Sequence, residues 1–220
     1  MPDIVLECAA VLFDMDGTLV DSREIVERMW LRWAARRRVS PEAILAVAHG
    51  RRTLETMQLV APEYATPEEA ARLDNEEEEE ARLHGGETAI PGAASLLSAL
   101  PPERWAVVTS AVREIALRRI TGVGLPAPRL LVGATDVRAG KPDPEGYRRA
   151  AAGLGFRPAE CVVIEDTPAG VEAGRRAGTA VVGMLTTYPA LEGCVVCVPD
   201  LRAIAARVDP SGRLRLHVQG

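Results

Sequence analysis

The chain lacks a long hydrophobic run. No segment offers the roughly 18 consecutive apolar residues that span a bilayer, and a content of 47% hydrophobic and 26% charged residues is ordinary for a globular protein. We therefore exclude a membrane protein. The first residues, Met-Pro-Asp-Ile, contain no basic segment ahead of an apolar stretch, so no signal peptide is recognised. The expected location is cytoplasmic.

An excess of basic charge is also missing. The formal net charge is −5 and the sequence pI is about 5.4, which argues against nucleic acid as a partner, because phosphate-backbone affinity comes from clustered Lys and Arg. The spacing of Cys194 and Cys197 resembles half of a zinc or redox site, but no second Cys or His pair accompanies it. We interpret all four cysteines as structural.

Two carboxylates stand where a buried strand is expected to end. The apolar run CAAVLF at 8–13 leads directly into Asp14 and Asp16, followed by Gly17. A buried parallel strand is a continuous hydrophobic run, so the carboxylates that follow it indicate a ligand, a metal or a reaction. An Asp-Gly turn of purely structural role is the alternative for this segment taken alone.

The rest of the chain divides into a helical part and an alternating part. Residues 19–88 have helical character, and we expect the acidic run 76–80 to form a solvated helix face. Beyond residue 91, short apolar strands alternate with helices, which is typical of a parallel sheet built from βαβ units. Strands are predicted at 105–109, 130–132, 161–164, 180–183 and 195–198, and helices at 93–100, 113–121, 145–154 and 169–177.

Polar residues follow several of these strands. Thr109 and Ser110 end one, Lys141 follows another, and Glu165 with Asp166 ends a third. Ligands of open parallel sheets bind outside the carboxyl ends of the strands, so these side chains should converge with those after the first strand. Each has a structural alternative: helix capping by the hydroxyls, a surface turn at the lysine, and charges at a helix start for the acidic pair. The joint pattern favours a site.

The chemistry of this set is that of metal-assisted phosphoryl transfer. Mg²⁺ prefers one or two carboxylates, water and phosphate oxygens. Phosphoryl transfer mainly needs in-line positioning and charge neutralisation, which a metal ion and a lysine supply. A carboxylate can also act as the nucleophile through an aspartyl-phosphate.

The chain resembles the haloacid dehalogenase superfamily of aspartate-nucleophile phosphotransferases over nearly its whole length. Four motifs occur in the family's order: DMDGTLVDS at 14–22, VVTS at 107–110, GKP at 140–142 and IEDTPAG at 164–170. The resemblance implies an α/β fold with a Rossmann-like three-layer core, residues 1–18 and 89–220, and a small inserted helical cap, residues 19–88.

The resemblance also implies roles for individual residues. Asp14 would be the nucleophile, and Asp16 would protonate the leaving alcohol and then deprotonate water. Asp14, the backbone carbonyl of Asp16 and Asp166 would hold Mg²⁺, with Glu165 as a further ligand or beside the ion. The phosphoryl group would be bound by Lys141, Thr18 and either Thr109 or Ser110. The presence of Asp16 favours phosphotransfer over dehalogenation.

Within the superfamily, the cap segment HGRRTLET at 49–56 is similar to that of small sugar and polyol phosphatases. His49, Arg51, Arg52 and Glu55 are its candidate substrate-binding residues, with a polar helix face as the structural alternative. In related β-phosphoglucomutases the cap supplies an arginine for a second phosphate, and Thr53 stands at that position here, which weakens the mutase interpretation.

The sequence therefore predicts a Mg²⁺-dependent phosphatase of small phosphorylated sugars or polyols that works through an aspartyl-phosphate. The alternative enzyme is a β-phosphoglucomutase-like phosphomutase. A signalling receiver domain has similar site chemistry, but receivers are smaller and lack a helical insertion behind the first strand. The expected partner is a small phosphorylated metabolite. Because no large apolar stripe stands out, the expected oligomeric state is a monomer.

Overall fold

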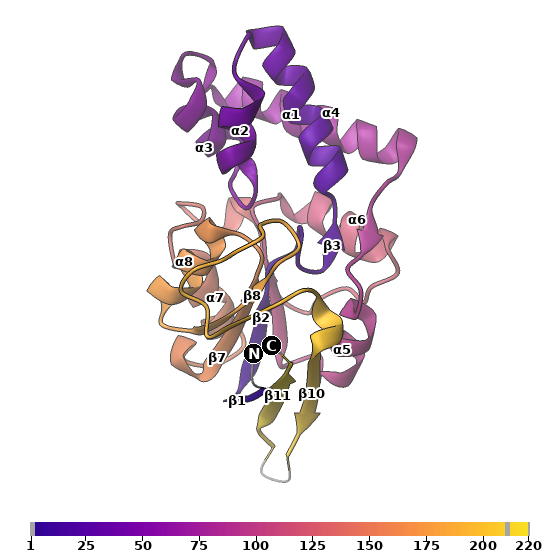
Figure 1. The fold of residues 1–220 in the computed structure, drawn as a ribbon, viewed down its shortest axis with the longest axis vertical. Helices are drawn as coiled ribbons and strands as arrows, with labels where there is room; N and C mark the ends of the chain where they lie inside the picture. The colour runs from indigo at the N-terminus through magenta and orange to yellow at the C-terminus, as the bar shows by residue number, and fades with distance from the viewer. Residues whose placement is uncertain (1–2, 210–211, 220) are drawn as a thin grey trace.

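A six-stranded parallel sheet forms the centre of the molecule. The computed structural model describes residues 3–209 and 212–219, and the strands of this sheet run in the order β6-β5-β2-β7-β8-β9 (Figure 1). β2 and β7 in its middle are buried along their whole length, as continuous apolar runs predict. The strands are β2 (Ala10–Phe13), β5 (Trp105–Val108), β6 (Leu131–Val132), β7 (Cys161–Glu165), β8 (Ala180–Met184) and β9 (Val196–Val198).

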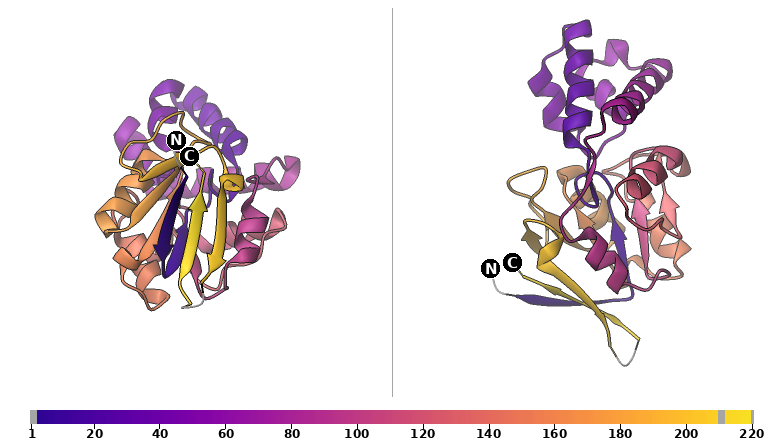
Figure 2. Two further views of the ribbon diagram at one scale, coloured as in Figure 1. Left: turned by 60° about the horizontal axis from the view of Figure 1, so that its bottom comes forward. Right: turned by 90° about the vertical axis from the view of Figure 1, so that its right-hand side faces the viewer.

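Helices cover both faces of this sheet. One hydrophobic cluster packs the first pair of helices on one face, and a second cluster packs the other pair on the opposite face, as the left view of Figure 2 shows. The predicted three-layer α/β core and its parallel strands are confirmed, with boundaries that shift by one or two residues. The helices are α5 (Ala93–Ala99) and α6 (Arg113–Gly122) on one face, and α7 (Glu145–Gly153) and α8 (Pro168–Ala177) on the other.

A second sheet was absent from the sequence-based prediction. β1 (Ile4–Cys8), β11 (Leu214–Val218) and β10 (Ile204–Val208) form an antiparallel sheet, and the two chain ends lie near each other (Figure 2, right). The predicted strand 8–13 is therefore wrong at its start, because the chain changes sheets at Ala9. β1 alternates exposed residues with half-buried or buried ones, which is the pattern of a strand with one solvated face.

Four further helices lie together beyond the carboxyl end of the parallel sheet (Figure 1). They surround a hydrophobic cluster of their own, which includes Trp30, Trp33 and Leu73. The chain leaves and re-enters the core through β3 (Val20–Asp21) and β4 (Thr88–Ala89), which pair with each other. The helices are α1 (Arg23–Arg37), α2 (Pro41–Ala48), α3 (Thr53–Val60) and α4 (Pro67–His84), and 3₁₀ turns lie at Pro62–Tyr64, Ala134–Asp136, Pro158–Glu160 and Leu201–Ala203.

The acidic run of α4 is not a uniformly solvated face. Glu77 is only 8% exposed and pairs with Arg119 of α6. Glu76 and Glu78 pair with arginines of α1 and α6. The prediction is wrong at Glu77, because the periodicity of one helix does not reveal an arginine supplied by a distant one.

Among the described residues, no helix combines the length and apolar composition that a membrane crossing requires.

Candidate active site

The predicted convergence of polar residues takes place at the carboxyl end of the parallel sheet. Asp14 follows β2, Thr109 follows β5 and Asp166 follows β7, and β2 lies between the other two strands. All three side chains are at most 5% exposed. The backbone of Asp14 continues the ladder, since its N–H donates to the carbonyl of Ile164 over 3.0 Å. The parallel register thus fixes the spacing of the site.

Lys141 joins two of the buried carboxylates. Its Nζ donates to Asp14 Oδ1 and, over 2.5 Å, to Glu165 Oε1. Although burial acts in the opposite direction, these two acids raise the pKa of Lys141 above its usual value. Burial also raises the pKa of Asp14, with Glu165 adding to the effect and Lys141 opposing it. Lys141 is therefore charged, and it supplies one positive charge to a strongly acidic centre.

Glu165 accepts hydrogen bonds on both oxygens. Tyr147 of α7 donates to Oε1 over 2.9 Å, while the N–H groups of Asp166 and Thr167 donate to Oε2 over 2.9 and 3.0 Å. The Thr167 hydroxyl donates to Oε2 over 3.1 Å and itself accepts from Gly170, which caps the start of α8. This network holds a fully buried carboxylate that orients Lys141.

Asp166 is held by hydroxyl groups from two other segments. Thr18 donates to its Oδ1 over 3.3 Å, and Thr187, in the loop after β8, donates to its Oδ2. Burial raises the pKa of Asp166 well above its usual value, and the nearby charges of Asp14 and Glu165 add to this. A buried carboxylate among like charges is costly to ionise unless a cation accompanies it.

The donor set fits a divalent metal ion. Asp14, Glu165 and Asp166 each place an oxygen within 4.8 Å of the others, in a group of three buried carboxylates that faces a single lysine. An oxygen-only set with excess negative charge suits Mg²⁺. Of the three, Glu165 already accepts five hydrogen bonds, so Asp14 and Asp166 have more free lone pairs for an ion.

Gly17 allows the first loop to pass close to Asp166. Its φ is +79°, and an added Cβ would lie 2.0 Å from Asp166 Oδ2. Only glycine combines that backbone conformation with such a close approach. The DxDG sequence therefore brings the loop after β2 against the carboxylate after β7.

Asp16 is held on one oxygen by two donors. Ser22, the residue before α1, donates to Asp16 Oδ1 over 2.6 Å, and Arg119 of α6 donates to the same oxygen over 2.9 Å. Arg119 is 4% exposed and also pairs with Glu77 and Glu87. These acids, Asp16 foremost, raise the pKa of Arg119 although burial opposes them.

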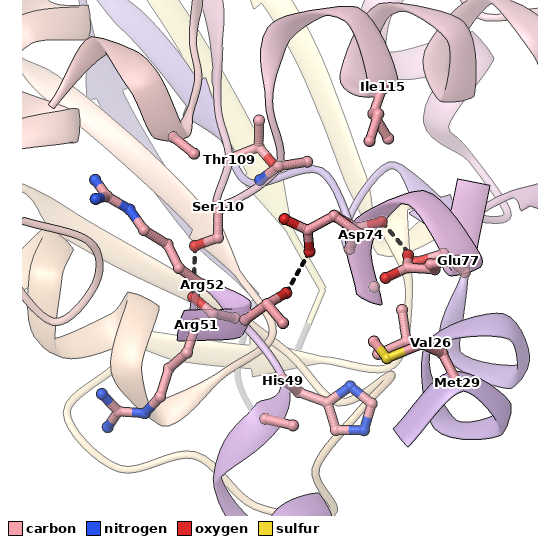
Figure 3. Close-up of a pocket in the computed structure, with 18 of the residues that line it drawn as sticks. Val26, Met29, His49, Arg51, Arg52, Asp74, Glu77, Thr109, Ser110 and Ile115 are labelled. Atoms are coloured by element: carbon pink, nitrogen blue, oxygen red, sulfur yellow. Dashed lines mark hydrogen bonds between the residues drawn. The ribbon is translucent and has the colours of Figure 1, made fainter. Parts of the chain in front are cut away.

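A cavity of about 210 Å³ lies between the sheet and the helices α1–α4 (Figure 3). Asp14, Asp16 and Asp166 line it from the core, and His49, Arg51 and Arg52 line it from the loop between α2 and α3. Figure 3 shows Asp74 and Glu77 of α4 on the other side of the pocket from the two arginines. The cavity thus joins the acidic centre to polar groups of the helical part.

The two candidate hydroxyls after β5 differ in their contacts. Ser110 lines the cavity but donates its hydroxyl proton to the carbonyl of Gly50, 2.8 Å away. Thr109 also lines the cavity, and its Oγ1 accepts from the N–H of Ala111 over 3.1 Å, which leaves its hydroxyl proton for another acceptor. Thr18, by contrast, lies outside this lining in the described structure and contacts Asp166.

The four candidate residues of the segment 49–56 also differ in their contacts. His49 lies 3.5 Å from Glu27, and burial lowers its pKa. Arg52 donates to the carbonyl of Val137 over 3.2 Å, and Glu55 accepts from the N–H of Gly140 over 2.9 Å. Arg51 forms no hydrogen bond or ion pair within the described residues. Arg52 and Glu55 therefore connect the helical part to the loop that carries Lys141.

Three residues of the site were not singled out from the sequence. Thr187 follows β8, so the rule that polar residues after parallel strands converge would have found it. Tyr147 and Arg119 lie within helices, where spacing alone gives no indication that they face Glu165 and Asp16. Only the packing of α7 and α6 against the sheet reveals their contacts.

Residues 8–178 match the family model described as haloacid dehalogenase-like hydrolase. The chain belongs to this family. It is 39% identical over 211 residues to hexitol phosphatase A of Escherichia coli (strain K12), covering 94% of this chain and 98% of that protein. It is 34% identical over 216 residues to glycerol-1-phosphate phosphohydrolase 2 of Saccharomyces cerevisiae, covering 90% and 85%.

Among solved structures, a hydrolase from Pseudomonas syringae is similar to this haloacid dehalogenase-like hydrolase, with a TM-score of 0.77 and 28% identity over 88% of this chain and 94% of that one. The predictions of the family, of the Rossmann-like α/β fold and of a phosphatase are confirmed.

Proposed function

We propose that this phosphatase hydrolyses monophosphate esters of small sugars or polyols with the help of Mg²⁺. The observation that carries the proposal is the buried group of Asp14, Lys141 and Asp166, whose two aspartates line a cavity of about 210 Å³. A cavity of that size suits a small metabolite. The two relatives above are named for hexitol phosphate and glycerol phosphate substrates, and we extend that substrate class to this chain.

In the proposed reaction, Asp14 attacks the phosphorus and the bond from phosphorus to the alcohol oxygen breaks. Asp16 gives a proton to the departing oxygen, which leaves an aspartyl-phosphate on Asp14 and a free alcohol. Asp16 then takes a proton from a water molecule that attacks the same phosphorus. Phosphate departs and Asp14 is restored.

The remaining residues neutralise and orient the phosphoryl group. Lys141 is a buried positive charge in contact with Asp14, and Thr109 has a free hydroxyl proton at the cavity wall, so we assign the hydroxyl contact to Thr109 rather than Ser110. Asp14, Asp166 and the carbonyl of Asp16 would hold Mg²⁺, with Glu165 beside it. The bound ion would supply charge neutralisation for the phosphoryl oxygens.

One contact in the cavity favours hydrolysis over mutase chemistry. Thr53, which stands where the related mutases have an arginine, donates its hydroxyl proton to Asp74. A carboxylate therefore lies where a second phosphate would need a positive charge, and like charges repel each other.

The first experiment is phosphate release from a panel of sugar, polyol and nucleotide monophosphates, with Mg²⁺ and with a chelator. We expect release from a sugar or polyol ester only with Mg²⁺. Asp14→Asn should reduce it by at least about a thousand-fold, because the nucleophile is lost. Asp21→Asn, in the same motif but on a half-exposed side chain, is the matched control and should retain activity.

Two results would count against the proposal. Activity retained by Asp14→Asn would remove the nucleophile assignment. Isomerised sugar phosphate in place of free phosphate, with β-glucose 1-phosphate in the panel, would favour the mutase.

We also propose a core of residues 1–18 and 89–220 with a cap of residues 19–88, and a monomeric cytoplasmic enzyme.

A further inference from the structure

Both ends of the cap reach Asp16: its start contacts Asp16 directly, and its last helix does so through Arg119. Ser22, directly before the first cap helix, and Glu77, in the last one, both belong to this cluster. Ser22 occupies the position before α1 that normally caps a helix, yet its hydroxyl makes no capping hydrogen bond and donates to Asp16 instead. The start of the cap is thus used to hold Asp16.

The geometry assigns to Arg119 the positioning of Asp16 for proton transfer to the leaving alcohol, an inference that rests on the proposed function. Arg119 and Ser22 both donate to Oδ1, and within residues 3–209 and 212–219 no hydrogen bond reaches Oδ2. One carboxylate oxygen is therefore fixed by two directional contacts, while the other remains available to carry a proton.

The charges around Arg119 fit a role in orienting Asp16 rather than in neutralising its charge. Glu77 and Glu87 pair with Arg119 from the cap helix α4 and from the segment that returns to the core. The guanidinium is therefore shared among three carboxyl groups and is not devoted to Asp16 alone. A rigid planar fork that binds several carboxylates at once is a property of arginine that lysine lacks.

Arg118 provides a matched control in the same helix. It pairs with Glu87 over 2.8 Å and with Glu78 over 2.6 Å, so it also connects α6 to the cap side of the molecule. None of its described contacts is with Asp16. A role in holding the cap should therefore be shared by Arg118 and Arg119, whereas a role in positioning Asp16 should belong to Arg119 alone.

The leaving group distinguishes the two roles. A sugar or polyol alkoxide is a strong base and needs a proton as it departs, whereas para-nitrophenolate is weakly basic and departs without one. The ratio kcat/KM includes only the steps up to loss of the leaving group, so it does not depend on the later attack by water. Mannitol phosphate and glycerol phosphate serve as alkyl esters, and para-nitrophenyl phosphate as the aryl ester.

We expect Arg119→Lys to lower kcat/KM for the alkyl esters about tenfold to a hundredfold, the range for a misplaced general acid, and to change the value for the aryl ester much less. Ser22→Ala should show the same selectivity more weakly. Arg118→Lys should affect both classes equally or not at all. Thermal unfolding shows whether Arg119→Lys is folded. If it is not, the loss of kcat/KM for the alkyl esters relative to the aryl ester in Ser22→Ala decides instead.

Equal losses for both ester classes in the Arg119 and Ser22 variants would overturn the inference, and so would a rise in alkyl-ester activity, which would mean that Arg119 restrains Asp16. Either result leaves the proposed function intact if the unaltered enzyme hydrolyses the alkyl esters. An unaltered enzyme that hydrolyses the aryl ester alone would instead reject the proposed substrate class.

Discussion

At the scale of single residues, Gly17 permits the close approach between the first loop and Asp166. Gly17→Ala would place a Cβ 2.0 Å from Asp166 Oδ2 at a φ of +79°. Gly155, with a φ of +82°, has no atom of the described residues within 4 Å of an added Cβ, so Gly155→Ala measures the backbone cost alone. We expect Gly155→Ala to lose about 1 kcal/mol of stability, and Gly17→Ala to lose more than that together with phosphatase activity.

Urea unfolding and phosphate release measure these two quantities. Full activity in Gly17→Ala would show that the carboxylate can move without consequence for the reaction. Equal losses of activity in both variants would point to strain in the backbone, since the two glycines share that conformation and differ only in their neighbours.

The Tyr147 hydroxyl contributes to stability through the buried Glu165. Tyr147→Phe keeps the packed ring and removes one hydrogen bond to a charged oxygen, for which we expect a loss of about 1.5–3 kcal/mol. Urea unfolding gives the value. A loss below a few tenths of a kcal/mol would mean that Lys141 and the N–H groups at the start of α8 satisfy Glu165 by themselves.

The predictability of the site differs among its residues for physical reasons. Asp14, Thr109 and Asp166 follow buried strands, and the rule for parallel sheets places such residues together. Tyr147 and Arg119 lie within helices, so nothing local separates them from any other tyrosine or arginine. The role of Thr18 as a phosphate ligand remains a prediction, and its contact in the structure is with Asp166.

At the scale of elements, Glu69 connects α4 to α1. Its Oε1 accepts from Arg72 over 2.8 Å, from Arg37 over 2.7 Å and from the Trp33 indole over 2.8 Å. These donors, Arg72 foremost, lower the pKa of Glu69 to about 2. Because the folded pKa is depressed, this stabilisation is fully present above the unfolded value of 4.5 and is lost as the pH falls toward 2.

Glu69→Gln should therefore lower the free energy of unfolding by about 1–2 kcal/mol at neutral pH, with a difference from the unaltered protein that shrinks below pH 4.5. Urea unfolding at a series of pH values, followed by tryptophan fluorescence, measures it. Glu68→Gln, one residue earlier on the exposed side of the helix, should show no such dependence. A constant difference across the series would contradict the ionic explanation.

Elements were predictable where the apolar pattern was continuous and less so where pairing is long-range. The start of α4 at Pro67 is specified locally, by Thr66 as its cap and by proline in its first turn. β1 pairs with β11, which lies about 200 residues later in the sequence, and such pairing leaves only a short alternating pattern in each strand. The charge run of α4 failed as a prediction at Glu77, whose partner comes from α6.

At the scale of the whole molecule, a divalent ion at the acidic centre should stabilise the fold. Asp14, Glu165 and Asp166 are buried together with one lysine, so the folded state carries repulsion that the unfolded chain relieves. Mg²⁺ at about a hundred times its dissociation constant would add about 2.7 kcal/mol. For a chain of 220 residues that corresponds to a rise in Tm of roughly 5–10 °C.

Asp166→Asn separates this effect from general salt screening. Removing one charge relieves repulsion, so the variant should be at least as stable as the unaltered protein without Mg²⁺, yet gain little when the ion is added. Glu172→Gln, on the exposed side of α8, should retain the full gain. Thermal unfolding with Mg²⁺ and with sodium at matched ionic strength measures both. A gain of equal size in Asp166→Asn would place the stabilising ion elsewhere, because a site built on Asp14 and Asp166 cannot lose one of its two carboxylates and keep its affinity.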